Sequence, residues 1–129
     1  MKNPNPKIKN NSDFKKQFNR RLINFSLEVI KLCKTLRKDR NLWPLTDQIM
    51  KSATSVGANV IEAKGSGSKK DYIKFFQIAL KSANETKYWL LLIRESSPKF
   101  RTLVQKLLSE INKLSKIIGA GILTMKGKR

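Results

Sequence analysis

Residues 68–82, SKKDYIKFFQIALKS, combine a helix start signal with a regular spacing of apolar side chains. Ser68, followed three residues later by Asp71, is a variant of the capping box, in which a side-chain oxygen accepts a hydrogen bond from a backbone N–H at the start of a helix. Apolar side chains then return with the three-to-four-residue period of an amphipathic helix: Tyr72, Phe76, Ala79, Ala83 and Leu90. The opposite face combines lysines with one aromatic ring: Lys70, Lys74, Lys81 and Tyr88. This row is a candidate for phosphate contacts, although rows of charge also occur simply as solvated faces.

Three further segments have the length and apolar period of helices: residues 12–38, 45–63 and 99–122. Breaks that contain Pro or Gly separate the four segments, at residues 40–44, 64–68 and 95–98. Because short connections favour antiparallel neighbours, we predict an all-α fold, an antiparallel up-down-up-down four-helix bundle over residues 12–122. Residues 1–11 are predicted to form a flexible basic arm, and residues 123–129 a basic tail.

Segment 12–38 carries two apolar stripes rather than one. The main stripe runs along one side of the helix: Phe14, Phe18, Leu22, Phe25, Val29 and Leu36. Ile23, Leu27 and Ile30 lie nearly opposite. This helix is therefore either buried on two sides within the monomer or part of a subunit interface, and we favour the interface. Residues 89–93 are apolar almost all round, which adds Trp89 and Leu92 to the predicted oligomer interface.

The composition excludes several classes of chemistry. The 129 residues include no His and one Cys, so there is no Ser-His-Asp or Cys-His arrangement and no His- or Cys-based zinc site. Asn59, Glu62, Asp71 and Glu85 are the polar residues most worth inspecting for catalysis, but helix capping or hydrogen bonds between helices explain them more simply. We therefore expect no enzyme activity, cofactor or metal. The lone Cys33 and the lack of an apolar run long enough to span a membrane favour a cytoplasmic protein without a membrane partner.

The net charge of +19 comes from 28 basic and nine acidic side chains and is concentrated at the two ends of the chain. A polyanion relieves the self-repulsion of such a chain and releases counterions, so RNA is the expected partner, with DNA as the alternative polyanion. A Lys-rich background composition is the competing explanation. The predicted nucleic-acid contacts are Lys15, Lys16, Arg20, Arg21, Lys34, Arg37, Lys38 and Arg40, then Lys70, Lys74 and Lys81, and finally the terminal Lys126, Lys128 and Arg129.

Two motifs connect the chain to a known family. The first is Leu45-Thr46-Asp47-Gln48-Ile49 with the positions that follow it in the same segment: Ala53, Ser55, Val56, Asn59, Val60 and Glu62. The second is residues 68–75 continued by 77–82. With these motifs the chain resembles the four-helix-bundle family of 23S ribosomal RNA intervening-sequence proteins. It departs from the family pattern at Gly57, where proline is usual, and at Ala63, where glycine is usual.

The resemblance implies a homo-oligomer, a ring of five subunits. The fold is also similar to that of the accessory variability protein of diversity-generating retroelements, a basic pentameric barrel that binds RNA and a reverse transcriptase. Our leading hypothesis is thus a non-enzymatic, homo-oligomeric helical bundle that binds structured RNA through phosphate contacts. The alternative is a protein-interaction scaffold whose partner is a reverse transcriptase or another protein.

Overall fold

A computed structural model describes residues 11–127 of the chain, and these residues form four long helices. They are α1 (Asn11–Leu36), α2 (Trp43–Lys64), α3 (Lys69–Ser96) and α4 (Arg101–Met125), with short 3-10 turns η1 (Arg40–Leu42) and η2 (Pro98–Phe100). No strand occurs in this part of the chain, so the all-α prediction is confirmed. The predicted arm lies almost entirely outside the described residues, and the predicted tail overlaps α4, which continues three residues beyond 122.

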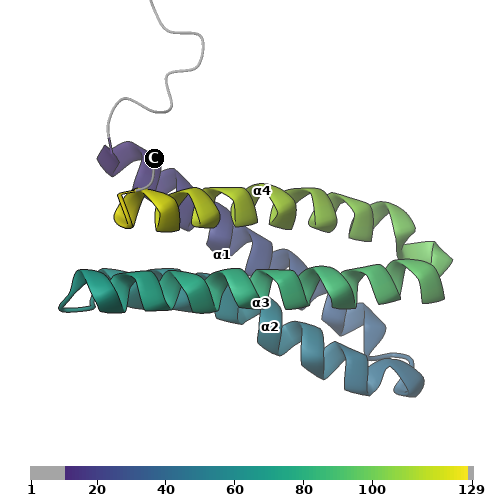
Figure 1. Ribbon diagram of the computed structural model, residues 1–129. Coiled ribbons are helices and arrows are strands. Elements are labelled where there is room, and N and C mark those ends of the chain that lie inside the picture. The colour runs from purple at the N-terminus through teal and green to yellow at the C-terminus, as the bar shows by residue number, and fades with distance from the viewer. Residues whose placement is uncertain (1–10, 128–129) are drawn as a thin grey trace, which may run out of the picture.

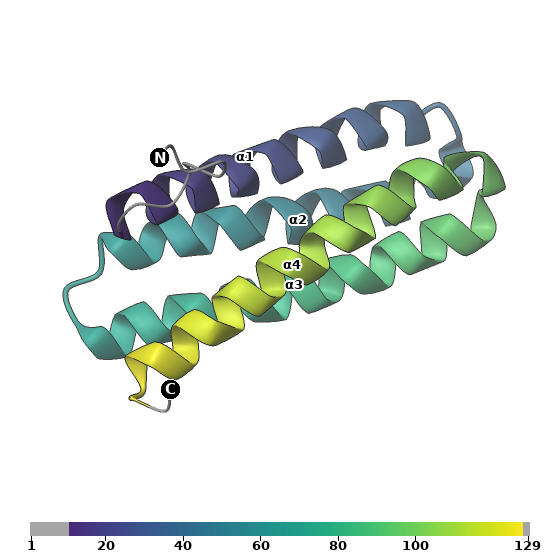
Figure 2. The same cartoon turned by 90° about the horizontal axis from the view of Figure 1, so that it is seen from above.

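The helices pack as a bundle in which each helix contacts the next one along the chain (Figures 1 and 2). α1 and α4 also touch, but the contact is slight, whereas α2 and α3 share the most extensive one. α1 and α3 therefore occupy diagonal positions, with α2 and α4 between them. None of the helices within residues 11–127 has both the length and the apolar character needed to cross a membrane.

The core contains the residues that the apolar period predicts. Val29 of α1, Val56 of α2, Leu90 of α3 and Ile111 of α4 are all buried in one continuous cluster. One predicted core residue is misplaced: Phe14 is 37% exposed. Phe14 belongs to the first turn of α1, where it lines an open cavity at the end of the bundle instead of packing inside it.

Local sequence signals explain where the helices begin. Ser68 caps α3, because its Oγ accepts a hydrogen bond from the backbone N–H of Asp71 at 3.0 Å, as predicted. Pro44 occupies the first turn of α2, where the N–H that proline lacks would have no partner in the helix. Gly65 follows the end of α2 and begins the short connection to α3.

A row of hydroxyl groups links α2 to α3 in the most extensive helix contact. Thr86 and Ser52 are buried with 2.9 Å between their side-chain oxygens, and the Oγ atoms of Ser82 and Ser55 lie 3.0 Å apart. Asn59 extends the row, since its Nδ2 donates to the backbone oxygen and to the Oγ of Ser55. These hydrogen bonds satisfy the polar groups between α2 and α3 and fix the position of α3 along α2. The outer face of α3 carries several lysines.

Candidate nucleic-acid interface

The predicted nucleic-acid contacts lie on two separate faces, because α1 and α3 are diagonal in the bundle (Figure 2). Lys16, Arg20 and Lys34 are exposed on α1, and Lys38 is exposed in the turn that follows it. Lys70, Lys74 and Lys81 are exposed on α3. The two groups therefore cannot act as one continuous contact surface on a single protomer. Each face has to be assessed by what surrounds its cations.

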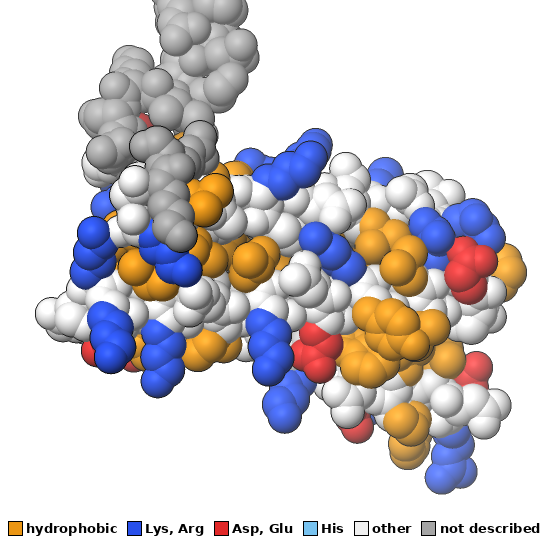
Figure 3. Space-filling view, in the orientation of Figure 1, with side chains coloured by type: hydrophobic (Ala, Val, Ile, Leu, Met, Phe, Trp, Pro, Cys, Tyr) orange, Lys and Arg blue, Asp and Glu red, His pale blue; other side chains and the backbone are white. Residues whose placement is uncertain are grey.

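On the α3 side, lysines from two helices converge. A shallow groove at the start of α3 is lined by one residue that follows α4, Lys126, and by residues of α3, namely Lys69, Lys70, Asp71, Ile73, Lys74 and Gln77. Asp71 is the one carboxylate among them, so the groove carries a clear positive excess. In Figure 3, lysine and arginine side chains gather around the N-terminal part of α3 and the C-terminal part of α4.

Farther along, Lys87 of α3 and Lys116 of α4 are near enough to affect each other electrostatically. Partial burial lowers the pKa of Lys87, and the positive charge of Lys116 lowers it further. Within residues 11–127 neither lysine forms an ion pair, and the ammonium group of Lys87 donates only to the Oδ1 of Asn84, at 3.4 Å. Such a pair of cations is stabilised by an anion placed between them. We call the combined surface the α3–α4 basic face, defined by Lys70, Lys74, Lys81, Lys87, Lys116 and Lys126.

On the α1 side, cations alternate with apolar side chains. Ile23 is 39% exposed and Leu27 is 48% exposed, while Ile30 is half-buried. The helices that pack against α1, which are α2 and α4, leave this stripe uncovered. The interpretation that α1 is buried on two sides within the monomer is therefore wrong. An apolar stripe bordered by lysines is typical of a protein-contact surface more than of a phosphate-contact surface.

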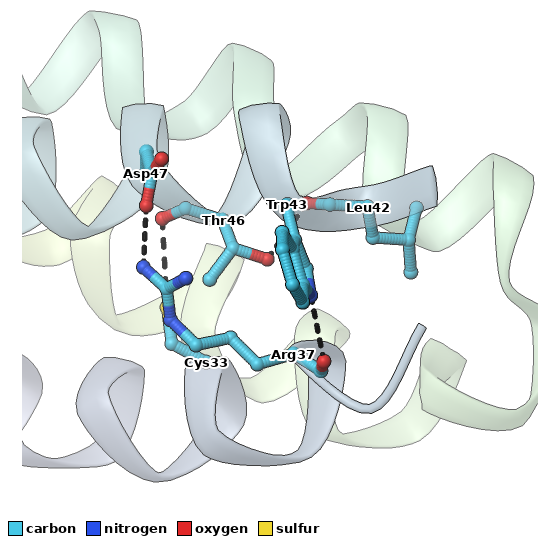
Figure 4. A network of polar contacts seen from close by, with 6 residues as sticks. All are labelled: Cys33, Arg37, Leu42, Trp43, Thr46 and Asp47. Carbon is cyan, nitrogen blue, oxygen red and sulfur yellow. Dashed lines mark hydrogen bonds and ion pairs between the residues drawn. The ribbon is translucent and has the colours of Figure 1, made fainter. Parts of the chain in front are cut away.

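Two predicted contacts have carboxylate partners within the fold. The Nε and Nη2 of Arg21 donate to the two carboxylate oxygens of Glu110 at 3.0 and 2.9 Å. This hydrogen bonding to Glu110 raises the pKa of Arg21, although partial burial opposes the shift. Arg37 forms an ion pair with Asp47 (Figure 4). Both arginines are thus paired with carboxylates of the same protomer, which makes them weaker candidates for phosphate contacts.

The neighbourhood of Arg37 is the turn between α1 and α2 (Figure 4). The indole Nε1 of Trp43 donates to the backbone oxygen of Arg37 at 2.7 Å, and the Oγ1 of Thr46 donates to the backbone oxygen of Leu42 at 2.8 Å. Arg40 lies over the Trp43 ring, 5.2 Å from its centroid, and remains exposed. Arg37 and Arg40 therefore help to hold this turn together. Lys15, the remaining residue of the predicted set, borders the cavity at the other end of α1.

The second predicted interface element lies toward the C-terminal end of α3. Trp89 is half-buried and packs edge-on against Tyr88, with 5.2 Å between ring centroids. The Nε1 of Trp89 is buried without a hydrogen-bond partner. Leu92 and its neighbour Leu91 are exposed, and an apolar patch is visible over this end of the molecule in Figure 3.

Sequence reasoning missed the convergence of α3 with α4. The period of segment 99–122 places Lys116 away from the core, but only the pairing of the two helices brings it beside Lys87. Lys126 was predicted as a tail contact and instead borders the groove at the start of α3. Lys128 and Arg129 lie outside the described residues. Within residues 11–127, no group of three or more His, Cys, Asp or Glu side chains is placed to hold a metal ion.

The four-helix fold and its paired sequence motifs define the class of protein. The chain belongs to the 23S rRNA-intervening sequence protein family, whose model matches residues 15–120. This result confirms the resemblance drawn from the motifs in residues 45–62 and 68–82.

A solved structure supports the same assignment. It is the crystal structure of a protein of unknown function from the S23 ribosomal protein family of Bacteroides thetaiotaomicron. The two chains are 30% identical with a TM-score of 0.77, and the match covers 81% of this chain and 97% of the other. No curated protein sequence matches the chain.

Proposed function

We propose that this protein is a non-enzymatic, homo-oligomeric RNA-binding protein of the cytoplasm, and that it contacts RNA phosphates through the α3–α4 basic face. The observation that carries the proposal is the groove at the start of α3, where Lys70 and Lys74 meet Lys126 from beyond the end of α4. Farther along the same two helices, Lys87 and Lys116 are near enough to affect each other electrostatically, and neither takes part in an ion pair within residues 11–127. The membership of the chain in a family named for a ribosomal RNA element supports RNA as the polyanion.

The chemistry of the face favours recognition of shape over sequence. Lysine ammonium groups neutralise phosphates and release condensed counterions, which provides affinity for any polyanion. Base-specific readout of RNA relies on stacking aromatic rings and on groups that bond to base edges. On α3 the exposed aromatic ring is Tyr88, so structured RNA with closely spaced phosphates is the preferred ligand.

The assembly belongs to the same proposal. We take the protomer to be the antiparallel up-down-up-down bundle expected from its short connections, and the oligomer to be the pentameric ring that the family resemblance implies. The α1 face with Ile23, Leu27 and Ile30, together with Trp89 and Leu92, is the proposed subunit interface. This arrangement assigns the apolar stripes to protein contacts and leaves the α3–α4 basic face to RNA.

The proposal is tested by comparing two variants with equal loss of charge. In the first, Lys70, Lys74, Lys87 and Lys116 are changed to Gln. In the matched control, which we call the α1 variant, four cations of α1 and the turn after it are changed to Gln: Lys16, Arg20, Lys34 and Lys38. Binding of a fluorescent RNA hairpin is measured by anisotropy across a salt series, and light scattering gives the mass of each variant.

Each phosphate contact contributes roughly 0.7–0.9 to the slope of log affinity against log salt. The α3–α4 variant is therefore expected to lose about three units of slope, while the α1 variant keeps most of its slope. Equal losses in the two variants would mean that binding follows net charge alone and would overturn the proposed surface. A wild-type protein that binds no RNA at low salt would overturn the function itself.

The exposed apolar patch at the C-terminal end of α3 favours a second candidate, a scaffold for a partner protein such as a reverse transcriptase. Leu91 and Leu92 lie side by side in sequence and are both exposed. The scaffold hypothesis predicts that a partner pulled down with the protein stays bound after nuclease treatment. Release of the partner by nuclease would instead identify RNA as the link.

A further inference from the structure

A cavity of about 620 Å³ opens at one end of the bundle, and it plays no part in the proposed RNA surface. All four helices contribute to its walls, which are mainly apolar: Phe14, Phe18, Val60, Tyr72, Phe76, Ile117, Ala120, Gly121, Thr124 and Met125. Its size is within the range of small-molecule sites, which is roughly 300–1,000 Å³. The cavity thus has the volume and lining of a ligand site.

Aromatic rings form the walls in two pairs. Tyr72 and Phe76 of α3 stack with 4.8 Å between ring centroids, and Phe14 and Phe18 of α1 stack at 6.3 Å. The Phe76 ring lies directly on the backbone of α4, because a Cβ at Gly121 would come within 2.9 Å of the Phe76 Cε2. These contacts give the walls a defined shape, and a ligand that enters would bury the exposed part of Phe14.

The mouth of the cavity is positively charged. Lys15 of α1 and Lys64 of α2 are among the lining residues, and none of the lining residues is acidic. Partial burial lowers the pKa of Lys64, and the charge of Lys15 lowers it further, so the two ammonium groups are close enough to repel each other. An anionic group at the mouth would remove this repulsion.

We propose that the cavity binds an amphipathic carboxylate, a medium-length fatty acid, with its alkyl chain between the aromatic pairs and its carboxylate between Lys15 and Lys64. The apolar walls fit the chain, and the two unpaired cations at the mouth fit the head group. A basic peptide or the alkyl ammonium of an amine lacks this complementarity. The lining of the cavity shares no residue with the α3–α4 basic face, so the two sites can be altered separately.

The probe is dodecanoate, titrated calorimetrically into the full-length protein below the concentration at which the acid aggregates. Shortening the acid from dodecanoate to decanoate and octanoate is expected to weaken binding about fourfold for each methylene removed. Dodecylamine, which has the same chain and the opposite charge, is expected to bind at least about tenfold more weakly than dodecanoate, because Lys15 and Lys64 repel its ammonium group. Equal affinity for dodecanoate and dodecylamine would overturn the assignment of the head group to the lysines.

Two sets of variants test the named residues. Lys15→Gln combined with Lys64→Gln is expected to weaken the affinity for dodecanoate about tenfold or more. The control with Lys34→Gln and Lys38→Gln removes equal charge at the far end of α1 and in the turn after it, and it is expected to leave the affinity unchanged. Thr124→Trp places a large side chain at an exposed position of the cavity lining, and it is expected to abolish binding.

Three results would overturn the proposal. The first is the absence of dodecanoate binding to the wild-type protein, and the second is an equal loss of affinity in the two lysine variants. The third is a Thr124→Trp variant whose oligomeric mass changes in light scattering while its affinity for dodecanoate stays the same. That result would mean that the cavity is a contact between copies of the chain and not a ligand site.

Discussion

The paired hydroxyls of Ser52 and Thr86 make a sharp prediction about stability. Both residues are buried at the contact of α2 with α3, and their oxygens are 2.9 Å apart. The Oγ1 of Thr86 is also 2.8 Å from the backbone oxygen of Ser82. Because a hydroxyl has one proton, Thr86 donates to Ser82 and accepts from Ser52. The other acceptor within reach of Ser52 is the Ile49 backbone oxygen, at a longer 3.4 Å.

The two single substitutions are expected to differ in cost. Thr86→Val keeps the shape but leaves the Ser52 hydroxyl with a poor acceptor, so the free energy of unfolding is expected to fall by about 1–3 kcal/mol. Ser52→Ala leaves Thr86 still bonded to Ser82, so its cost is expected to be smaller, about 0.5–1.5 kcal/mol. The double variant has no stranded hydroxyl, and it is expected to lose about 1 kcal/mol less than the sum of the single losses.

Urea unfolding followed by circular dichroism measures all three variants. The protein concentration is kept constant, because self-association makes apparent stability depend on it. Thr102→Val, at an exposed position of α4, is the control and is expected to change stability by no more than about 0.5 kcal/mol. Strict additivity of the two core substitutions would refute the reasoning, since it would mean that the hydroxyls do not depend on each other.

Two more predictions concern single buried positions. Gly57→Ala is expected to raise the free energy of unfolding by up to about 1 kcal/mol, because the added Cβ would be 3.5 Å from the Leu22 Cβ, an ordinary contact; lower stability in the same urea assay would show that α1 and α2 need glycine there. Cys33 is buried and its thiol pKa is raised to about 11, chiefly by burial. A disulfide reagent at pH 8 is therefore expected to label it only after unfolding, and rapid labelling of the folded protein would contradict this. Since the folded state favours the protonated thiol, the contribution of Cys33 to stability is constant below its usual pKa of 9.0 and is lost as the pH rises through about 11.

Most of the fold could be predicted from local signals. The capping pair Ser68 and Asp71 marks the start of α3, and the apolar period identifies buried residues such as Val29 and Ile111 without any knowledge of the other helices. These features depend on neighbours three or four positions away, which the sequence places side by side. Phe14 was misjudged because the period continues into the first turn of α1, whereas the covering helices diverge there.

The candidate sites depend on contacts between distant parts of the chain. Arg21 and Glu110 are 89 positions apart, so no local rule predicts that the positive charge of this arginine is paired with a carboxylate. The approach of Lys87 to Lys116 and the cavity lined by four helices likewise follow from how the helices cross. Sequence patterns can rank such residues by chemistry, but only the packing decides which of them meet.

The acidic residues show how the charge of the molecule is organised. Glu110 pairs with Arg21 of α1, Asp47 pairs with Arg37 in the turn after α1, and Glu95 pairs with Arg94 at the end of α3. The first pair joins α1 to α4, the second spans the turn between α1 and α2, and the third lies at the end of α3. Within residues 11–127, no ion pair involves the lysines of the α3–α4 basic face. The positive charge of the α3–α4 basic face is thus not offset by ion pairs within the described part of the protomer. Under the proposed function, a ring would bring several such faces together, and their repulsion would oppose assembly. RNA that spans neighbouring protomers would relieve this repulsion, and because linkage is reciprocal, assembly would strengthen RNA binding by the same factor.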